Sequence, residues 1–288
     1  MKRPCPLFLF LLLMALGTRT AAAQDPKPYL AVGDSIPFGY NPTVPPGDLA
    51  AYLGYPVDVA GVLNLALTNA SCPGQTSGGF INVAATDNGC NNEWRKLGLP
   101  LFVTYSSLAE SQLEYAVTFL REHRGTALVT ITIGGDDLLL LEDACTAQFP
   151  GNLAAIESCD LAGLGDVLVN YAKNLATIYL AIRFEARYAG PIVAVNYFSS
   201  DYVNGVETTA IAELNDVTLG VTALFGGRVA DAFSAFEKAS AAGGGLPCAP
   251  NVGLAFTNAA APGGCDVHPT PLGQQLIANL VVQALHRD

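Results

Sequence analysis

Ser35 is the first residue whose type and position suggest chemistry. It follows an apolar segment at residues 29–32, which is typical of a buried strand, and the sharp turn Gly33-Asp34. Ligands bind at the carboxyl ends of strands in a parallel α/β sheet, and Ser35 would lie at such an end. On this segment alone, Ser35 is interpreted either as a nucleophile or as an ordinary turn or helix-capping residue.

A serine nucleophile requires a base, a group that orients the base, and donors for the oxyanion. The chain has three histidines, of which His123 lies in a charged segment and His286 near the end of the sequence, so both are interpreted as solvated. His268 follows a loop rich in Pro and Gly and has Asp266 two residues before it. His268 is the candidate base and Asp266 its partner, with a plain loop histidine as the alternative.

The elements that must position these residues alternate along the chain. After the strand at residues 29–32, strands are expected at residues 57–67, 127–133, 192–197 and 227–230. Helices are expected at residues 105–123, 164–188, 208–224, 233–240 and 270–285, and loops at 41–55, 149–160 and 241–265. This alternation implies βαβ units and a mainly parallel sheet covered on both faces. No repeat or linker interrupts it, so one domain over residues 24–288 is expected.

Residues 1–23 have the layout of a secretory signal peptide. Lys2 and Arg3 precede an apolar run at residues 7–16, and three alanines at 21–23 offer a cleavage site. An uncleaved membrane anchor is the alternative. The run is too short for a comfortable membrane span, and no later stretch reaches about eighteen uninterrupted apolar residues. We therefore expect a secreted or periplasmic chain without stable membrane insertion.

The mature chain would be strongly acidic. Cleavage after residue 23 removes three positive charges and no acid, which takes the formal net charge from −11 to −14. Such a chain repels phosphate backbones and anionic membranes, which argues against nucleic-acid binding and favours neutral or cationic substrates.

Cysteine usage agrees with export, because six cysteines remain in the mature chain. Six cysteines allow fifteen pairings. Their spacing falls into three local couples, which predicts the disulfides Cys72 with Cys90, Cys145 with Cys159 and Cys248 with Cys265. Loops of this size are worth about 3 kcal/mol each in the chain-entropy model. A zinc site is the competing idea, but no C-x-x-C or paired histidine spacing supports it.

Four short motifs resemble those of the SGNH, or GDSL, hydrolases, in the order of that family. The motifs are G-D-S-I at residues 33–36, C-P-G-Q-T at 72–76, I-G-G-D-D-L at 133–138 and D-V-H-P at 266–269. The serine motif of α/β-hydrolases, G-x-S-x-G, is not met, because Pro37 replaces the second glycine. The resemblance implies a three-layer α/β/α sandwich, flavodoxin-like, with a five-stranded parallel sheet and no metal or cofactor.

Carried over by motif position, the resemblance makes Ser35 the nucleophile and His268 the base. The backbone N–H groups of Ser35 and Gly74 would bind the oxyanion, and position 136 would add a donor from its side chain. The predicted disulfides would then hold the loops that carry Gly74 and His268.

Two positions depart from the family's pattern. The family places its acid three residues before the histidine, whereas Asp266 is two before, so a backbone carbonyl is the alternative orienting group. Asp136 stands where the family has asparagine, and an ionised carboxylate cannot donate a hydrogen bond. Asp136 is therefore expected to be a protonated donor or to point away from the site; otherwise the enzyme is slow.

Together these observations predict a secreted serine ester hydrolase of the esterase or lipase kind, acting as a monomer on a small-molecule or lipid ester. The alternatives are an O-deacetylase of polysaccharides or a phospholipase of the same fold and, from another class, a non-catalytic extracellular binding module. Trp94, Phe102 and Tyr105 are candidates for lining an acyl pocket, with core packing as the alternative.

Overall fold

A parallel sheet forms the centre of the structure, a computed structural model that describes residue 1, residues 25–261 and residues 263–286. All but the first residue of the predicted signal peptide lie outside the described residues. The five strands are ordered β2-β1-β3-β4-β5, and each neighbouring pair is parallel. They are β1 (Lys27–Gly33), β2 (Leu65–Asn69), β3 (Leu128–Thr132), β4 (Ile192–Val195) and β5 (Arg228–Ala230). The predicted α/β fold is confirmed, and its topological switch point lies between β1 and β3.

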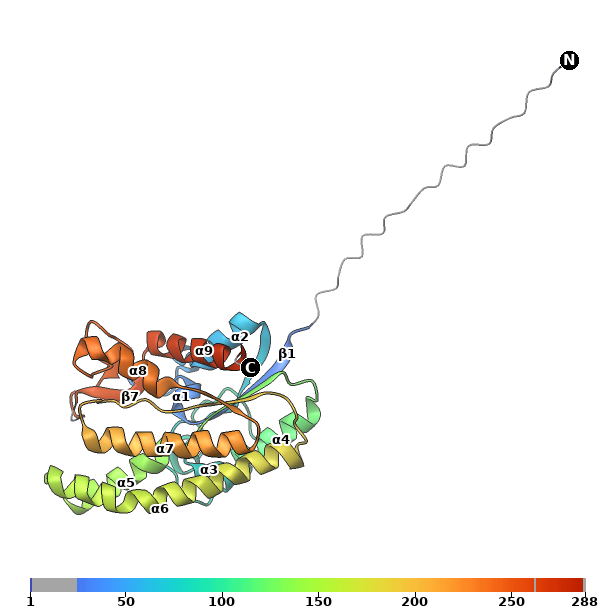
Figure 1. Cartoon of the computed structure of the whole chain (residues 1–288). Coiled ribbons are helices and arrows are strands. Elements are labelled where there is room, and N and C mark those ends of the chain that lie inside the picture. The colour runs from blue at the N-terminus through green and yellow to red at the C-terminus, as the bar shows by residue number, and fades with distance from the viewer. Residues whose placement is uncertain (2–24, 262, 287–288) are drawn as a thin grey trace.

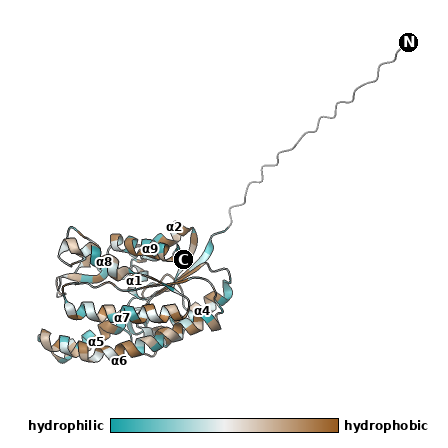
Figure 2. Ribbon diagram, viewed as in Figure 1, coloured by the Kyte–Doolittle hydropathy of each residue, from teal (hydrophilic) through white to brown (hydrophobic). Residues whose placement is uncertain are grey.

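Helices cover both sides of this sheet. Those of the described residues are α1 (Ser35–Phe38), α2 (Tyr55–Leu63), α3 (Ser77–Ile81), α4 (Gln112–Glu122), α5 (Gly135–Gln148), α6 (Leu153–Leu180), α7 (Gly205–Leu224), α8 (Ala232–Ser240) and α9 (Pro271–His286). Figure 1 shows α2, α8 and α9 on one side of the sheet and α4, α6 and α7 on the other. Hydrophilic and hydrophobic residues are mixed along most of these helices (Figure 2), as expected for helices that bury one face.

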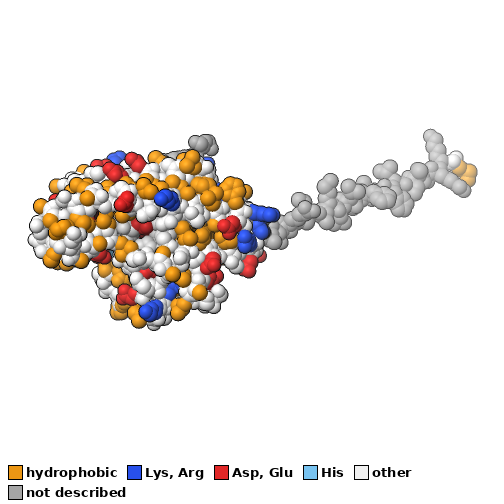
Figure 3. Space-filling model, turned by 90° about the horizontal axis from the view of Figure 1, so that it is seen from below, with side chains coloured by type: hydrophobic (Ala, Val, Ile, Leu, Met, Phe, Trp, Pro, Cys, Tyr) orange, Lys and Arg blue, Asp and Glu red, His pale blue; other side chains and the backbone are white. Residues whose placement is uncertain are grey.

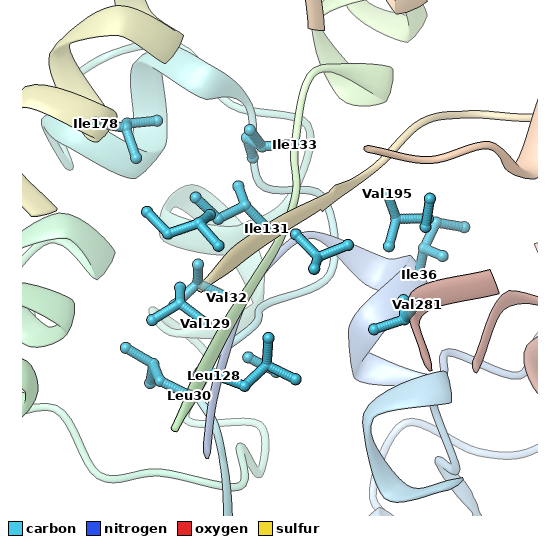
Figure 4. Close-up of a cluster of buried hydrophobic side chains, with 14 of the residues drawn as sticks. Leu30, Val32, Ile36, Leu128, Val129, Ile131, Ile133, Ile178, Val195 and Val281 are labelled. Carbon is cyan, nitrogen blue, oxygen red and sulfur yellow. The ribbon is translucent and has the colours of Figure 1, made fainter. Parts of the chain in front are cut away.

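The hydrophobic core lies on both faces of the sheet. Residues 29–32 of β1 have no exposed surface. In the close-up of Figure 4, Ile178 of α6 lies on one side of the strands, whereas Ile36 and Val281 lie on the other. Truncating a buried aliphatic side chain of this kind to alanine typically costs about 2–5 kcal/mol. The end of β1, where Ser35 lies, is therefore held by packing from two layers.

The strand predicted at residues 57–67 is wrong. Tyr55–Leu63 form the helix α2, and β2 begins only at Leu65. Pro56 occupies the first turn of α2, and Asn64 ends it in the left-handed conformation with φ 50°. Both are helix-boundary signals. The apolar run itself does not discriminate a short helix from a strand, which explains the error.

Two predicted loops also contain regular structure. In the segment 149–160, α6 begins at Leu153, and the side chain of Asn152 caps it by accepting a hydrogen bond from the Ala155 N–H at 3.3 Å. The segment 241–265 contains β6 (Ala255–Thr257), which pairs antiparallel with β7 (Cys265–Pro269). The helix α5 was not predicted, and the helix expected at 105–123 begins only at Gln112. The remaining predicted strands and helices occur close to their expected positions.

Three disulfides cross-link the described chain and join the predicted pairs Cys72–Cys90, Cys145–Cys159 and Cys248–Cys265. Disulfides are typical of proteins in oxidising compartments, so these three are consistent with an extracellular location. Within the described ranges, none of the helices has the length and apolar character needed to cross a membrane.

Some apolar side chains on α6 are exposed, such as Leu161 and Val169. Hydrophobic atoms are scattered among polar ones on the face in Figure 3.

Candidate active site

Ser35 lies directly after β1, as the first residue of the short helix α1. The turn before it requires glycine, since Gly33 has φ +136° and a Cβ there would lie 1.8 Å from the carbonyl oxygen of Thr132. Asp34 caps α1 by accepting a hydrogen bond from the Ile36 N–H at 2.9 Å. Close packing of β1 against β3 and the cap of α1 thus fix the position of Ser35 at the carboxyl edge of the sheet.

His268 and Asp266 lie on β7, which packs against α1. The His268 Nε2 atom is 3.0 Å from the Ser35 Oγ atom, and its Nδ1 atom is 2.5 Å from Asp266 Oδ1. The same Asp266 oxygen accepts the backbone N–H of His268 at 2.9 Å. The structure thus brings together the three predicted residues in the hydrogen-bonded order acid, imidazole, hydroxyl.

The two-residue spacing of Asp266 and His268 follows from their place on a strand. Side chains at positions i and i+2 of a strand point to the same face, so Asp266 reaches the imidazole of His268. The Cys248–Cys265 disulfide joins β7 to the preceding loop, and the ring of Tyr40 packs on the imidazole with centroids 4.7 Å apart. The departure from the three-residue spacing is therefore compatible with an orienting carboxylate.

Electrostatics favour an ionised Asp266. Burial acts to raise the pKa of Asp266, but the hydrogen bonds and charge of His268 outweigh it and lower that pKa below its ordinary value. The Asp266 and His268 side chains are 14% and 16% exposed. An ionised carboxylate at this place holds one imidazole tautomer and stabilises the imidazolium that forms in catalysis.

Gly74 lies in the loop that follows β2, next to the end of β1. The Cys72 N–H donates to the carbonyl oxygen of Gly33 at 3.0 Å, and the Asn88 N–H donates to that of Gly74 at 2.8 Å. Gly74 has φ +76°, and a Cβ there would lie 2.3 Å from the carbonyl oxygen of Asn88. Only glycine fits this close approach, and the Cys72–Cys90 disulfide joins the two chain segments that make it.

Asp136 lies in the first turn of α5, immediately after β3, and is 6% exposed. Its Oδ1 atom accepts a hydrogen bond from Asn88 Nδ2 at 3.0 Å. Asp136 and Ser35 line the same cavity.

Burial raises the pKa of Asp136 well above its ordinary value, and the charge of Asp34 raises it further, whereas the Asn88 hydrogen bond lowers it. Burial also raises the pKa of Asp34, to about 7, although hydrogen bonds from Tyr197 and Ile36 lower it. The α5 N-terminus favours an ionised carboxyl by about 2 kcal/mol at most. Desolvation of a buried ion costs several kcal/mol, so burial opposes ionisation of Asp136 more than the helix N-terminus favours it.

A cavity of about 260 Å³ extends from Ser35 between α5, the start of α6 and the start of α7. Its apolar lining includes Leu138, Leu139, Leu141, Leu153, Ile156, Leu164, Val206 and Ile211. The aromatic residues predicted for this role do not line it. Trp94 is buried in a separate cluster with Phe38 and Tyr52, and the Tyr105 hydroxyl donates to the Ala70 carbonyl oxygen at 2.8 Å. The pocket role is therefore wrong for these residues, and the alternative, core packing, applies to Trp94.

Three supporting residues were not predicted. Gln112 makes two hydrogen bonds with the backbone of Gly33, from Gly33 N–H to Oε1 at 2.5 Å and from Nε2 to the carbonyl oxygen at 3.0 Å. The Tyr197 hydroxyl donates to Asp34, and Asn88 contacts both Gly74 and Asp136. Gln112 opens a helix and Asn88 lies in a loop, and polar residues occur at many such positions without function. Tyr197 lies just after β4 and has no sequence signal of its own.

No group of three or more His, Cys, Asp or Glu residues is arranged to hold a metal ion in the part of the chain that the structure describes. The chemistry that the site offers is nucleophilic attack by a serine hydroxyl that shares its proton with a histidine.

Comparison with known proteins agrees with the fold. The model of the GDSL-like lipase/acylhydrolase family matches residues 31–276. A phospholipase A1 from Streptomyces albidoflavus NA297 is 20% identical with a TM-score of 0.58, covering 90% of this chain and 99% of that one. An extracellular lipase from Streptomyces rimosus is 21% identical with a TM-score of 0.59 and the same coverage. A catalytic mutant of an acetylxylan esterase from Geobacillus stearothermophilus is 15% identical with a TM-score of 0.54, covering 91% and 95%.

At these identities the structural likeness concerns the fold alone, and no curated protein matches the chain. The family match covers most of the chain: it begins within β1, includes Ser35 and His268, and ends within α9. The chain belongs to the GDSL-like lipase/acylhydrolase family and, by that membership, is an ester hydrolase.

Proposed function

We propose that this chain is a serine carboxylic ester hydrolase that works through an acyl-enzyme on Ser35. The observation that carries the proposal is the continuous series of hydrogen bonds from Asp266 through His268 to Ser35, with 3.0 Å between His268 Nε2 and Ser35 Oγ. That distance lies within the range over which a base takes a proton from a nucleophile.

In the proposed reaction, Ser35 Oγ attacks the ester carbonyl carbon while its proton passes to His268 Nε2. The tetrahedral intermediate collapses when His268 returns this proton to the leaving alcohol, and the acyl group stays on Ser35. Water then loses a proton to His268, attacks the acyl-enzyme and releases the acid, and Ser35 recovers its proton. Asp266 stabilises the imidazolium in both halves of the cycle.

The oxyanion would be held by the Ser35 and Gly74 N–H groups and by a neutral Asp136. The burial of Asp136 and the neighbouring charge of Asp34 support the neutral form, since both raise its pKa. A neutral carboxylic acid donates one hydrogen bond, as the asparagine of the family's motif would. One oxyanion donor is typically worth about 10²–10³ in rate.

Labelling with a fluorophosphonate probe tests the proposal, because only an activated serine reacts quickly. We expect the native chain to be labelled and to hydrolyse p-nitrophenyl esters, and Ser35→Ala to do neither. Full esterase activity in Ser35→Ala would refute the assignment. A folded native chain that is neither labelled nor active would favour the non-catalytic binding module.

We further propose that the preferred acyl group is longer than acetyl. The cavity beside Ser35 is lined by leucine and isoleucine side chains from α5 and α6, and about 260 Å³ is far more than an acetyl methyl group fills. A panel of p-nitrophenyl esters from acetate to dodecanoate tests this point. A rise of kcat/KM with chain length supports a lipase-like esterase, and a maximum at acetate would favour a deacetylase.

Export is part of the proposal. The motivating observations are the signal-like residues 1–23, the three disulfides and the lack of a membrane-spanning helix in the described ranges. Amino-terminal sequencing of the protein recovered outside the cytoplasm is expected to begin at Gln24. Retention of the full-length chain in the reduced cytosol would contradict it.

A further inference from the structure

Asn88 contacts two of the three groups proposed to bind the oxyanion. Its backbone N–H donates to the carbonyl oxygen of Gly74 at 2.8 Å, and its side-chain Nδ2 donates to Asp136 Oδ1 at 3.0 Å. Gly74 follows β2 and Asp136 follows β3, so these groups come from different parts of the sheet edge. Asn88 therefore links the loop after β2 to the start of α5.

The loop that carries Asn88 is held on both sides. Asp87 is buried, and its carboxylate accepts backbone N–H groups of Gly89 at 3.2 Å and Asn92 at 3.4 Å. The Cys72–Cys90 disulfide joins the residue two positions after Asn88 to the residue two positions before Gly74. Since the Asn88 carbonyl also lies against the Cα of Gly74, a shift of one segment displaces the other.

The Asn88–Asp136 hydrogen bond determines which oxygen of a neutral Asp136 carries the proton. The asparagine NH₂ group is a donor only, so Asp136 Oδ1, which accepts from it, acts as the carbonyl oxygen. The proton then belongs on Oδ2, the oxygen left to donate to the oxyanion.

We propose that Asn88 is a positioning residue that aligns Gly74 and Asp136 into one oxyanion hole and orients the Asp136 carboxyl for donation. This inference rests on the proposed function, in which Asp136 is a donor. Asn88 acts through Asp136 and Gly74, and it need not touch the substrate.

A double-mutant cycle with Asn88→Ala and Asp136→Ala tests the inference. We expect Asn88→Ala to lower kcat by about 10- to 100-fold, with KM changed less than about threefold, because an oxyanion donor acts mainly in the transition state. We expect the double variant to be no slower than Asp136→Ala alone, since Asn88→Ala keeps the backbone N–H that binds Gly74 and removes only the hydrogen bond to Asp136. Additive losses would overturn the proposal.

The pH profile supplies a readout that a merely structural role would not move. The Asn88 hydrogen bond lowers the pKa of Asp136, so its removal raises that pKa. The alkaline limb of kcat for Asn88→Ala should therefore move to higher pH while the plateau falls. A lower plateau with an unmoved limb would overturn the proposal.

Asn92→Ala is the matched control, because Asn92 lies in the same loop and its side chain donates to the Asp87 carbonyl oxygen at 3.0 Å. We expect its kcat to stay within about twofold of the native value. If Asn88→Ala does not fold, the isosteric Asn88→Asp replaces the donor by an acceptor and should lose activity that recovers partly at acidic pH. Unchanged kcat in folded Asn88→Asp would overturn the inference, whereas absent fluorophosphonate labelling of the native chain would overturn the proposed function itself.

Discussion

Replacing Asp136 by asparagine tests whether the proposed oxyanion hole requires a proton on the Asp136 carboxyl. The side chain keeps its shape and the oxygen that accepts from Asn88 at 3.0 Å, and it presents an NH₂ donor in place of the acid O–H. The donor therefore persists at every pH. In the native chain the donor is lost when Asp136 ionises, and the resulting carboxylate repels the oxyanion.

The sign of the pH effect follows from the raised pKa of Asp136. Below this pKa the native acid donates, so the native chain and Asp136→Asn should have similar kcat/KM. As the pH rises through the pKa of Asp136, the native chain loses one oxyanion donor, and its kcat/KM should fall by about 10²–10³-fold. Asp136→Asn should lack this alkaline limb and become the faster enzyme at high pH.

The assay is the initial rate of hydrolysis of one p-nitrophenyl ester across the pH range, corrected for spontaneous hydrolysis. Asp136→Ala serves as the control, since it lacks the donor at all pH values and should be slow throughout. Superimposable profiles for the native chain and Asp136→Asn would refute the protonated-acid mechanism. Activity of Asp136→Ala equal to the native value would show that the two backbone donors suffice.

Three further outcomes are expected. Asp266→Ala should lower kcat by about 10²–10⁴-fold, and a loss below tenfold would assign the orientation of the imidazole to another group. The pKa of Asp34 is raised to about 7 in the folded chain, from an ordinary value near 4. The stabilisation that this raised pKa gives the folded state is therefore complete below about pH 4 and is lost as the pH rises through 7. In urea titrations this removes at most roughly 4 kcal/mol of unfolding free energy, and an equal loss in Asp34→Asn would contradict the assignment. Ile156→Trp fills the cavity and should lower kcat/KM for dodecanoate about tenfold without affecting acetate, whereas Leu161→Trp, exposed on the same helix, should change neither.

The sequence predicts the two central strands, β1 and β3, well because each is an apolar run that ends at or just before a glycine. The strand before Ser35 and the one before Gly134 are buried on both faces, so their signal does not depend on which helix covers them. Most long helices are also recovered, since each buries one face against the sheet.

The helix α5, which forms one wall of the cavity, could not be predicted because it lacks the pattern of one buried and one exposed face. Some residues of α5 pack against α6, and others line the cavity, where their apolar side chains stay partly exposed. Apolar residues therefore occur on more than one face of α5, and the run Leu138–Leu141 shows no helical periodicity. The sequence analysis instead offered Trp94, Phe102 and Tyr105 as candidates for the acyl pocket, with core packing as the alternative, and none of them lines the cavity. Trp94 packs in a cluster with Phe38 of α1, as that alternative states.

The sequence motifs identify Ser35 and His268, but not how the charge of the site is balanced. Asp34, Asp136 and Asp137 lie where β1 and β3 end. After burial, the charges of Asp34 and Asp137 raise the pKa of Asp136, and the charge of Asp137 raises that of Asp34. The chain carries a formal net charge of −11, so no excess of distant positive charge offsets this cluster. A fully ionised cluster would oppose the negative charge that attack by Ser35 creates. The arrangement is compatible with catalysis when at least one proton remains in the cluster, and Asp136, buried beside the cavity and held by a donor on one oxygen only, is the carboxyl best placed to keep it.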